Sequence, residues 1–364
     1  MEKIKFTNKD KTEFFKTLKQ RVDDYFKTNG IKKTANGKMI IKTMIMLLIF
    51  FVPYALILSK MFNIWQMYLL VIIMGFGVAG IGLSIMHDAN HGAYSKHQYV
   101  NELLGFTLNL VGAASSTWKI QHNLLHHTYT NIYHYDEDID PNISMRFTAE
   151  AKRKKYHYFQ YIYALVLYGF LTFAWVLYQD YVQLAVYKKK GLIGNVKSKY
   201  INELIIMTIT KIFYYIYILV IPVIILKDSV EPWQFAVAFF TMHFVTGVVL
   251  SVVFQTAHVV EGTTFPKPDA NNNIEDEWAI HQMKTTSNFS RRNLFLSWYI
   301  GGLNYQIEHH LFPKICHIHY RLISKIVRET AKEFEIPYLE QPTFGGAIYS
   351  HLKLLKKLGQ NNTV

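Results

Sequence analysis

Hydrophobic residues gather in four long runs along this chain of 364 residues. The first two runs are joined by a short polar connection, and so are the last two. Each run is close to the ~20 residues that cross a bilayer as a helix. We therefore predict an all-α integral membrane protein with four transmembrane helices in two hairpins and a helical cytosolic cap; the predicted spans are about 41–59, 65–86, 204–226 and 233–257.

Two further apolar segments are not predicted to cross the bilayer. Residues 103–118 are short for a crossing and favour a re-entrant or buried segment. Residues 161–179 lie between two basic loops, and basic loops stay on the cytoplasmic side. We therefore expect residues 161–179 to lie in the interface or to pack as a cytosolic helix. Four crossings then leave both termini on the cytoplasmic side.

The two ends of the chain differ from the middle. Residues 1–35 are charged, unlike a signal peptide, and their apolar positions recur at helical spacing. They predict an amphipathic helix on the membrane or on the cytosolic part of the protein, or an ordinary solvated helix. We assign residues 36–340 to one membrane domain and residues 341–364 to a C-terminal cytosolic tail.

The composition fits a few spans with large water-facing parts, because 51% of the residues are hydrophobic but the mean hydropathy is only +0.08. The net charge of +13 indicates a basic cytoplasmic face, and it would also suit an acidic redox partner or anionic lipids. No nucleic-acid motif accompanies this charge, so we expect no nucleic-acid partner. The single cysteine, Cys316, excludes an internal disulfide and a cysteine-ligated iron–sulfur cluster.

Histidines form three clusters at the predicted membrane boundary. The clusters are HDANH, HNLLHH and GGLNYQIEHHLFP, and another histidine ends the last span. Helix positions i and i+4 share a face, so paired imidazoles there can point at one ion. Polar groups near a membrane are rare unless they function. We predict a metal site and take as candidate ligands His87, His91, His122, His126, His127, His258, His309 and His310.

Eight imidazoles exceed what one tetrahedral zinc ion uses, so they suit two metal ions. Ligand softness alone leaves Fe, Cu, Zn and Ni open. The acidic run at 136–140, including Asp138, is either a solvated loop or a set of carboxylates that accept hydrogen bonds from ligand imidazoles. We predict structural roles for the other polar residues in apolar surroundings. We expect Lys211 to snorkel to the membrane surface, and we expect packed structural roles for His243, His281, His317 and His319.

HDANH, HNLLHH and QIEHH, in that order, resemble the three histidine boxes of the membrane-bound fatty acid desaturases, over about residues 40–340. GGLNYQIEHHLFP resembles the third box of the front-end subgroup, in which Gln replaces the first His, here Gln306. HHTYTN and HIHYRLISKIVRETAKEFEIPY are similar to the same subgroup. The resemblance implies a di-iron centre, O2, two electrons per turnover and a cis double bond placed in an unactivated acyl chain. The carrier of that chain could be coenzyme A, acyl carrier protein or a membrane lipid.

The resemblance also assigns roles to residues. The seven box histidines match the family's ligands, and His258 matches an extra histidine after the last span. Gln306 would be a weak ligand, a hydrogen-bonding neighbour or a spacer. The sequence has no HPGG haem motif, so the resemblance implies an external cytochrome b5 or ferredoxin-like electron donor. Phe254 replaces a polar residue of related acyl-CoA desaturases, which puts a water-mediated contact there in doubt. Trp118 and Tyr305 are either tunnel-lining or ordinary interfacial aromatics.

Two kinds of alternative remain open. A sphingolipid desaturase or a lipid hydroxylase would use the same scaffold, and the boxes alone do not separate these reactions. A membrane metal transporter would instead place its ligands near mid-membrane on discontinuous helices. Here the clusters fall at the ends of the predicted spans, which favours catalysis on a membrane lipid.

Overall fold

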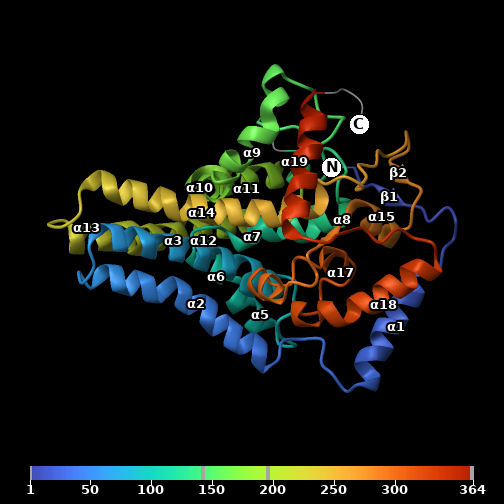
Figure 1. Ribbon diagram of the computed structural model, residues 1–364, viewed down its shortest axis with the longest axis horizontal. Coiled ribbons are helices and arrows are strands. Elements are labelled where there is room, and N and C mark those ends of the chain that lie inside the picture. The colour runs from blue at the N-terminus through green and yellow to red at the C-terminus, as the bar shows by residue number, and fades with distance from the viewer. Residues whose placement is uncertain (1, 141–143, 194–196, 361–364) are drawn as a thin grey trace.

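The computed structural model describes residues 2–140, 144–193 and 197–360. Four of its helical segments are long and apolar enough to cross a membrane: 37–58, 64–90, 198–226 and 232–258. Figure 1 shows them side by side, reaching to the left as far as the tip near α13, with most of the remaining helices at the other end and α10 beside α14. The fold is an all-α membrane protein with two helical hairpins.

The spans are built from several consecutive helical elements. The fourth candidate segment agrees with its predicted span within one residue at each end, while the first and third begin four and six residues earlier than predicted. The second ends four residues later than predicted, so that His87 lies on its last turn and His91 directly follows it. The elements are α2 (Gly37–Leu58), α3 (Ile64–Gly80), η1 (Ile81–Met86), α4 (His87–Asn90), α12 (Lys197–Tyr215), η6 (Ile216–Val220), α13 (Ile221–Leu226) and α14 (Pro232–His258).

Glycines on α3 bring the spans together. A Cβ on Gly75 would lie 2.8 Å from the Met242 carbonyl oxygen of α14, and one on Gly77 would lie 2.8 Å from the Phe50 nitrogen of α2. Small residues at such positions allow helix backbones in a membrane to approach closely. The helix α3 therefore packs between α2 and α14 and carries the first histidine cluster at its end.

The cap is a set of shorter helices at the histidine end of the spans. We use the word cap for the described residues outside the four candidate spans and outside the two hairpin loops at 59–63 and 227–231. Its helices are α1 (Phe14–Thr28), α5 (Gln98–Gly105), α6 (Thr107–Leu110), α7 (Ser115–Trp118), η2 (Lys119–His126), α8 (His127–Tyr129), η3 (Glu137–Ile139), η4 (Lys155–Phe159), α9 (Gln160–Tyr168), α10 (Leu171–Ala174), η5 (Trp175–Gln179), α11 (Asp180–Lys189), α15 (Trp278–Thr285), α16 (Leu294–Tyr299), α17 (Gln306–Leu311), η7 (His317–His319), α18 (Tyr320–Glu333) and α19 (Phe344–Gln360). Two short parallel strand pairs join distant segments: β1 (Lys5–Phe6) with β2 (Asn273–Ile274), and β3 (Asn288–Phe289) with β4 (Glu340–Gln341).

Both apolar segments outside the predicted spans are broken. Residues 103–118 form parts of α5, α6 and α7 and do not make a candidate span. Residues 155–168 and 171–189 form two helical parts bent by 61°, which together are apolar enough for a broken span or a re-entrant loop. That this second segment does not cross stays a prediction.

Both ends of the chain carry packed helices. The inner face of α1 buries Phe14, Leu18, Val22 and Phe26 against the cap, as its helical spacing predicted. The segment expected to be a tail contains α19, which packs against α9 and α14; residues 361–364 lie outside the described part.

The prediction that Lys211 snorkels is wrong. Its side chain is 3% exposed and its ammonium group lies 2.9 Å from an Asp180 carboxylate oxygen. It also donates to the carbonyl oxygens of Gly112, Trp175 and Val176. The sequence pattern of the span does not reveal this partner, because Asp180 belongs to a separate bent helix.

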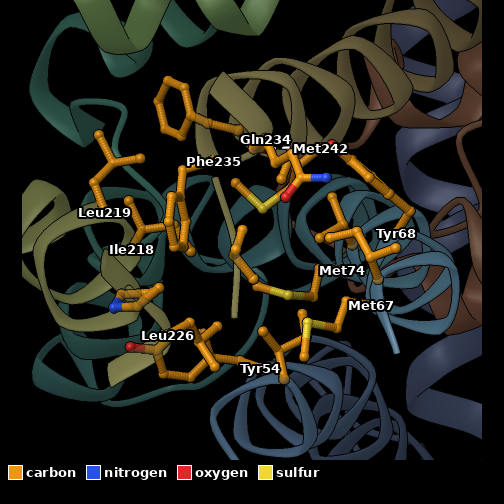
Figure 2. Close-up of a pocket in the computed structure, with 17 residues that line it drawn as sticks. Tyr54, Met67, Tyr68, Met74, Ile218, Leu219, Leu226, Gln234, Phe235 and Met242 are labelled. Atoms are coloured by element: carbon orange, nitrogen blue, oxygen red, sulfur yellow. Dashed lines mark hydrogen bonds between the residues drawn. The ribbon is translucent and has the colours of Figure 1, made fainter. Parts of the chain in front are cut away.

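A narrow apolar cavity of about 70 Å³ lies between the spans, in the half nearer the hairpin loops. Figure 2 shows Met67, Met74 and Met242 among its lining residues, together with Phe235 and Ile218. None of the lining residues is a candidate metal ligand, so the candidate chemistry must be sought at the other end of the spans.

Candidate metal centre

The eight candidate ligands come from five separate helical elements. His87 and His91 lie at the end of the second span, and His258 ends the fourth. The π-helix η2 and the start of α8 supply the second cluster, and α17 supplies His309 and His310. All eight side chains are buried.

Four histidines form a first group. Ligand nitrogens of His87, His91, His122 and His309 all lie within 4.8 Å of one another. The four residues come from three segments of the chain, because His87 and His91 belong to the same helix end. This spacing is that of donors arranged around a single ion.

A second group lies beside the first. Ligand nitrogens of His126, His258 and His310 lie within 4.8 Å of one another, and His127 forms a further such set with His309 and His310. The His127 and His310 rings are stacked at 4.4 Å. The arrangement therefore offers two neighbouring ion positions. His127 lies between them, next to His309 of the first group and His310 of the second.

A π-helix explains how HNLLHH serves both groups. The element η2 follows π-helical geometry over Lys119–His126, and the His127 amide N–H donates to the His122 carbonyl oxygen five residues earlier. The His122 and His127 Nε2 atoms are consequently 3.3 Å apart, while His126 turns toward His258. The sequence left both His126 and His127 as partners of His122, and a His126 nitrogen also lies within 4.8 Å of His122. Short π-helical stretches are frequent at functional sites.

Buried nitrogens without hydrogen-bond partners point into the centre. Within the described residues, no partner is found for either ring nitrogen of His87 or for the Nε2 atoms of His91, His126, His258 and His310. Leaving a buried polar atom unpaired costs about 1–3 kcal/mol. Several such atoms converging from different helices fit metal coordination, which would pair all of them. The donor set also suits a transition metal, because imidazole binds Fe, Cu, Zn and Ni.

The acidic loop holds His126 from behind. Both Asp136 carboxylate oxygens lie 3.1 Å from His126 Nδ1, and an Asp138 oxygen lies 3.3 Å away. Burial alone lowers the pKa of His126, but the two carboxylates outweigh burial and raise it to about 9. Asp138 also accepts a hydrogen bond from Gln121. Carboxylates in this position fix the orientation and raise the basicity of a ligand imidazole.

Three further ligands are held at Nδ1 by groups that the sequence analysis missed. Tyr320 OH lies 3.2 Å from Nδ1 of His309, and Gln282 Oε1 lies 2.8 Å from Nδ1 of His310. The Thr285 carbonyl oxygen lies 3.3 Å from Nδ1 of His258. The Thr285 group is a backbone carbonyl, so no side-chain pattern in the sequence announces it.

The environment of the other candidate ligands in and beside the cap favours the neutral form of their imidazole rings. Burial, together with neighbouring imidazoles, keeps the pKa values of His91, His122, His127, His309 and His310 well below the ordinary value of 6.5. A neutral imidazole has a free nitrogen lone pair, which is the form that binds a metal ion.

Gln306 and two aromatic residues surround the centre. Gln306 is fully buried and its side chain lies near His258. Among the residues that the structure describes, neither its amide nitrogen nor its amide oxygen has a hydrogen-bond partner. The Trp118 ring stacks on His122 at 4.5 Å, and the Phe254 ring lies 5.8 Å from it. Tyr305 instead donates to the Arg291 carbonyl oxygen and packs in the cap.

The four histidines expected to be structural lie outside both groups. His243 is buried and bonds to Tyr214, as predicted. The His281 ring packs 5.0 Å from Phe6. His317 Nδ1 lies 2.8 Å from Asp88, the neighbour of His87, and His319 lies 3.3 Å from the Thr34 carbonyl oxygen.

Comparison with known proteins identifies the family. The chain matches the fatty acid desaturase family over residues 63–342. It is 37% identical over 369 residues to an acyl-lipid (8-3)-desaturase of Physcomitrium patens, covering 98% of this chain and 74% of that protein. It is 36% identical over 348 residues to an sn-1 linoleoyl-lipid 6-desaturase of Arthrospira platensis, covering 96% and 93%. It is also 36% identical over 362 residues to the enzyme of that name from Synechocystis sp., covering 99% and 98%.

The site and fold define a membrane protein with a buried histidine-lined centre at one end of its spans, and the family match makes it an oxidoreductase. The chain belongs to the fatty acid desaturase family and is a fatty acid desaturase.

Proposed function

We propose that this protein is a front-end acyl-lipid desaturase, which places a cis double bond on the carboxyl side of an existing one. The observation that carries the proposal is the convergence of eight buried imidazoles, with unpaired nitrogens, at one end of four spans. The relatives named above support the regiochemistry and the lipid-bound substrate, since their names specify acyl-lipid 6- and (8-3)-desaturation. Gln306 at the start of the third box supports the front-end subgroup.

We further propose two iron ions as the cofactor. His87, His91, His122 and His309 would hold one ion, and His126, His258 and His310 would hold the other, with His127 between them. When bound, iron supplies the O2-dependent oxidation that removes hydrogen from an unactivated methylene group. Asp136, Gln282 and Tyr320 keep three of the rings oriented for this role. Gln306 and Asp138 would tune the second position as neighbours or weak ligands.

The chain itself must position the acyl group, because a saturated chain offers no polar handle at the reacting carbons. Trp118 lies against His122, and its ring is 5.7 Å from that of His87. A methylene group held against this indole would be close to the first group of ligands. Burial of all eight imidazoles excludes bulk water from the reacting atoms.

We also propose that the metal centre and both termini face the cytoplasm, where an external one-electron carrier delivers the electrons. The basic loops of the cap support this orientation. The transporter alternative receives no support, because the candidate ligands sit at span ends and in the cap rather than at mid-membrane.

The test is the fatty-acid profile of a host that expresses the chain, measured by gas chromatography–mass spectrometry with double bonds located by derivatisation. We expect a new cis double bond on the carboxyl side of an existing one, absent with His309→Ala. The purified protein should contain two irons per chain. A hydroxylated product would contradict desaturation while keeping the metal site. A protein that holds exchangeable zinc and yields no product from supplied acyl lipids would contradict the proposal as a whole.

A further inference from the structure

One face of the cap carries a row of basic residues directly behind the third histidine cluster. On α18, Arg321, Lys325, Arg328 and Lys332 are all exposed. Their spacing of i, i+4, i+7 and i+11 places them within an arc of about 60° at 100° per residue. We call these four residues the α18 basic stripe.

The stripe is not neutralised by the protein itself. The nearby ion pairs in the described part of the chain are Arg21–Glu333 and Arg291–Glu340, and none of the four stripe residues takes part in an ion pair there. The two acidic residues of α18 lie toward α1, where Glu333 pairs with Arg21 at 2.7 Å and Glu329 also acts on Arg21. Such a row of like charges repels itself, so an anionic partner would stabilise it.

The opposite face of the same helix is fixed in the cap. Tyr320, Ile323, Val327 and Ala331 are buried in one hydrophobic cluster with α1 and α17. Figure 1 shows α18 beside α1 at the end of the molecule away from the hairpin loops. The helix α18 is therefore anchored in the cap by its buried face, and its basic face is left exposed.

Tyr320, on the buried face of the same helix, links α18 to the metal centre. Tyr320, next to Arg321, is buried, and its hydroxyl lies 3.2 Å from Nδ1 of His309. Nε2 of the same ring faces His127 at 3.0 Å, inside the centre. Leu322, beside the stripe, is 43% exposed and offers an apolar contact. A partner seated here is one buried tyrosine away from a candidate ligand.

The reaction needs electrons from such a partner. Forming one double bond removes two hydrogen atoms from the acyl chain, and one O2 becomes two water molecules. The acyl chain supplies two electrons and two protons, so two more electrons and two more protons must come from elsewhere. A one-electron carrier supplies these electrons in two visits, and solvent supplies the protons.

We propose that the α18 basic stripe is the docking surface for a small acidic one-electron carrier protein, with Tyr320 between that carrier and His309. This inference rests on the proposed desaturase function. Complementary charge at such a surface speeds encounter and fixes orientation, and its effect falls as salt rises.

The test compares the iron-loaded enzyme in lipid nanodiscs with two charge-matched variants. One reverses the stripe with Arg321→Glu, Lys325→Glu, Arg328→Glu and Lys332→Glu. The other reverses four exposed lysines away from the stripe, with Lys152→Glu, Lys155→Glu, Lys189→Glu and Lys199→Glu. Reduced plant-type ferredoxin and reduced cytochrome b5 serve as separate probes, and they show which kind of carrier is accepted.

We expect stripe reversal to raise the KM for the accepted carrier at least ten-fold at low salt, with kcat at saturating carrier within two-fold and with a weaker salt dependence. The matched control should change KM less than two-fold. An unchanged KM in the stripe variant, or an equal rise in the control, would overturn the proposal. If the fourfold variant does not fold, Lys325→Gln and Lys332→Gln decide the question, with a smaller rise in KM expected for each.

A chemical reductant separates this proposal from the proposed function. With dithionite and a small mediator in place of the carrier, all three proteins should form product at equal rates. Loss of this carrier-independent activity in the stripe variant alone would show that the stripe supports the centre itself and would overturn docking. Absence of product from the unaltered enzyme with every reductant would instead contradict the desaturase function.

Discussion

At the scale of single residues, the centre depends on the groups that hold the ligand rings from behind. Asp136 is fully buried, and both of its carboxylate oxygens lie 3.1 Å from His126 Nδ1. It also accepts a hydrogen bond from the backbone N–H of Asn131. Asp136→Asn keeps the size but removes the charge that orients His126. Loss of such a partner typically lowers metal affinity by about 10–100-fold, so we expect iron content to fall during dialysis against a chelator.

The control for Asp136→Asn is Asp140→Asn in the same acidic loop. Asp140 contacts only the exposed His134 among the histidines. Iron content by elemental analysis should match that of the unaltered protein in this variant. Equal iron loss in both variants would show that general loop charge, rather than the Asp136–His126 contact, retains the metal.

His351 gives a pH dependence of stability that does not involve the metal centre. It lies between Tyr168 OH, 2.6 Å from Nε2, and the Val259 carbonyl oxygen, 2.6 Å from Nδ1. Burial lowers its pKa from 6.5 to about 4. The unfolded chain therefore takes up a proton below pH 6.5 and the folded chain does not until about pH 4. The contribution of His351 to the free energy of unfolding is complete above pH 6.5. It is lost as the pH falls from 6.5 to about 4, a total of about 3 kcal/mol at 1.36 kcal/mol per pKa unit.

The substitution His351→Gln removes this proton uptake. We expect the difference in melting temperature between pH 7.5 and pH 5 to be smaller in the variant, measured in detergent by differential scanning fluorimetry. The acid sensitivity of the eight centre histidines is common to both proteins and cancels in the comparison. An unchanged difference would show that His351 does not contribute.

At the scale of elements, a buried ion pair stabilises the bent helical segment 155–189 against the third span. Lys211 binds Asp180 and three carbonyl oxygens, two of which belong to the π-helix η5. Lys211→Met leaves the Asp180 charge buried without its partner, which typically costs about 3–5 kcal/mol. Thermal unfolding in detergent should show the loss directly.

The double variant Lys211→Met with Asp180→Leu removes both charges and should regain most of the lost stability, because no unpaired charge remains. If the double variant is as unstable as the single one, the hydrogen bonds from Lys211 to the carbonyl oxygens matter more than the ion pair.

The elements also show where sequence reasoning succeeds and where it fails. Runs of apolar residues are long enough to locate four spans, and histidine spacing locates the clusters, because both signals are local. The π-helical register of η2, which brings the Nε2 atoms of His122 and His127 to 3.3 Å, depends on packing around the helix. Asp180 and Lys211 lie on different helices and far apart in the sequence. Tyr320 and His309 are closer along the chain but belong to the separate helices α18 and α17, so the periodicity of a single helix announces neither contact.

At the scale of the whole molecule, orientation in the membrane is the prediction with the sharpest test. The two hairpin loops, at 59–63 and 227–231, lie at the end of the bundle opposite the metal centre. We predict that these loops face away from the cytoplasm, and that the cap loop around Asn271 faces it. The single cysteine, Cys316, is fully buried, so introduced cysteines can be labelled against a silent background.

The variants Lys60→Cys, Asp228→Cys and Asn271→Cys place one thiol on each loop. In intact cells, a membrane-impermeant maleimide should label the cysteines at positions 60 and 228. The cysteine at position 271 should react only after the membrane is opened. Labelling of position 271 in intact cells would reverse the proposed orientation and put the metal centre on the side away from cytoplasmic electron carriers. The same result would remove the docking of such a carrier on the α18 basic stripe, because the stripe lies in the cap with Asn271.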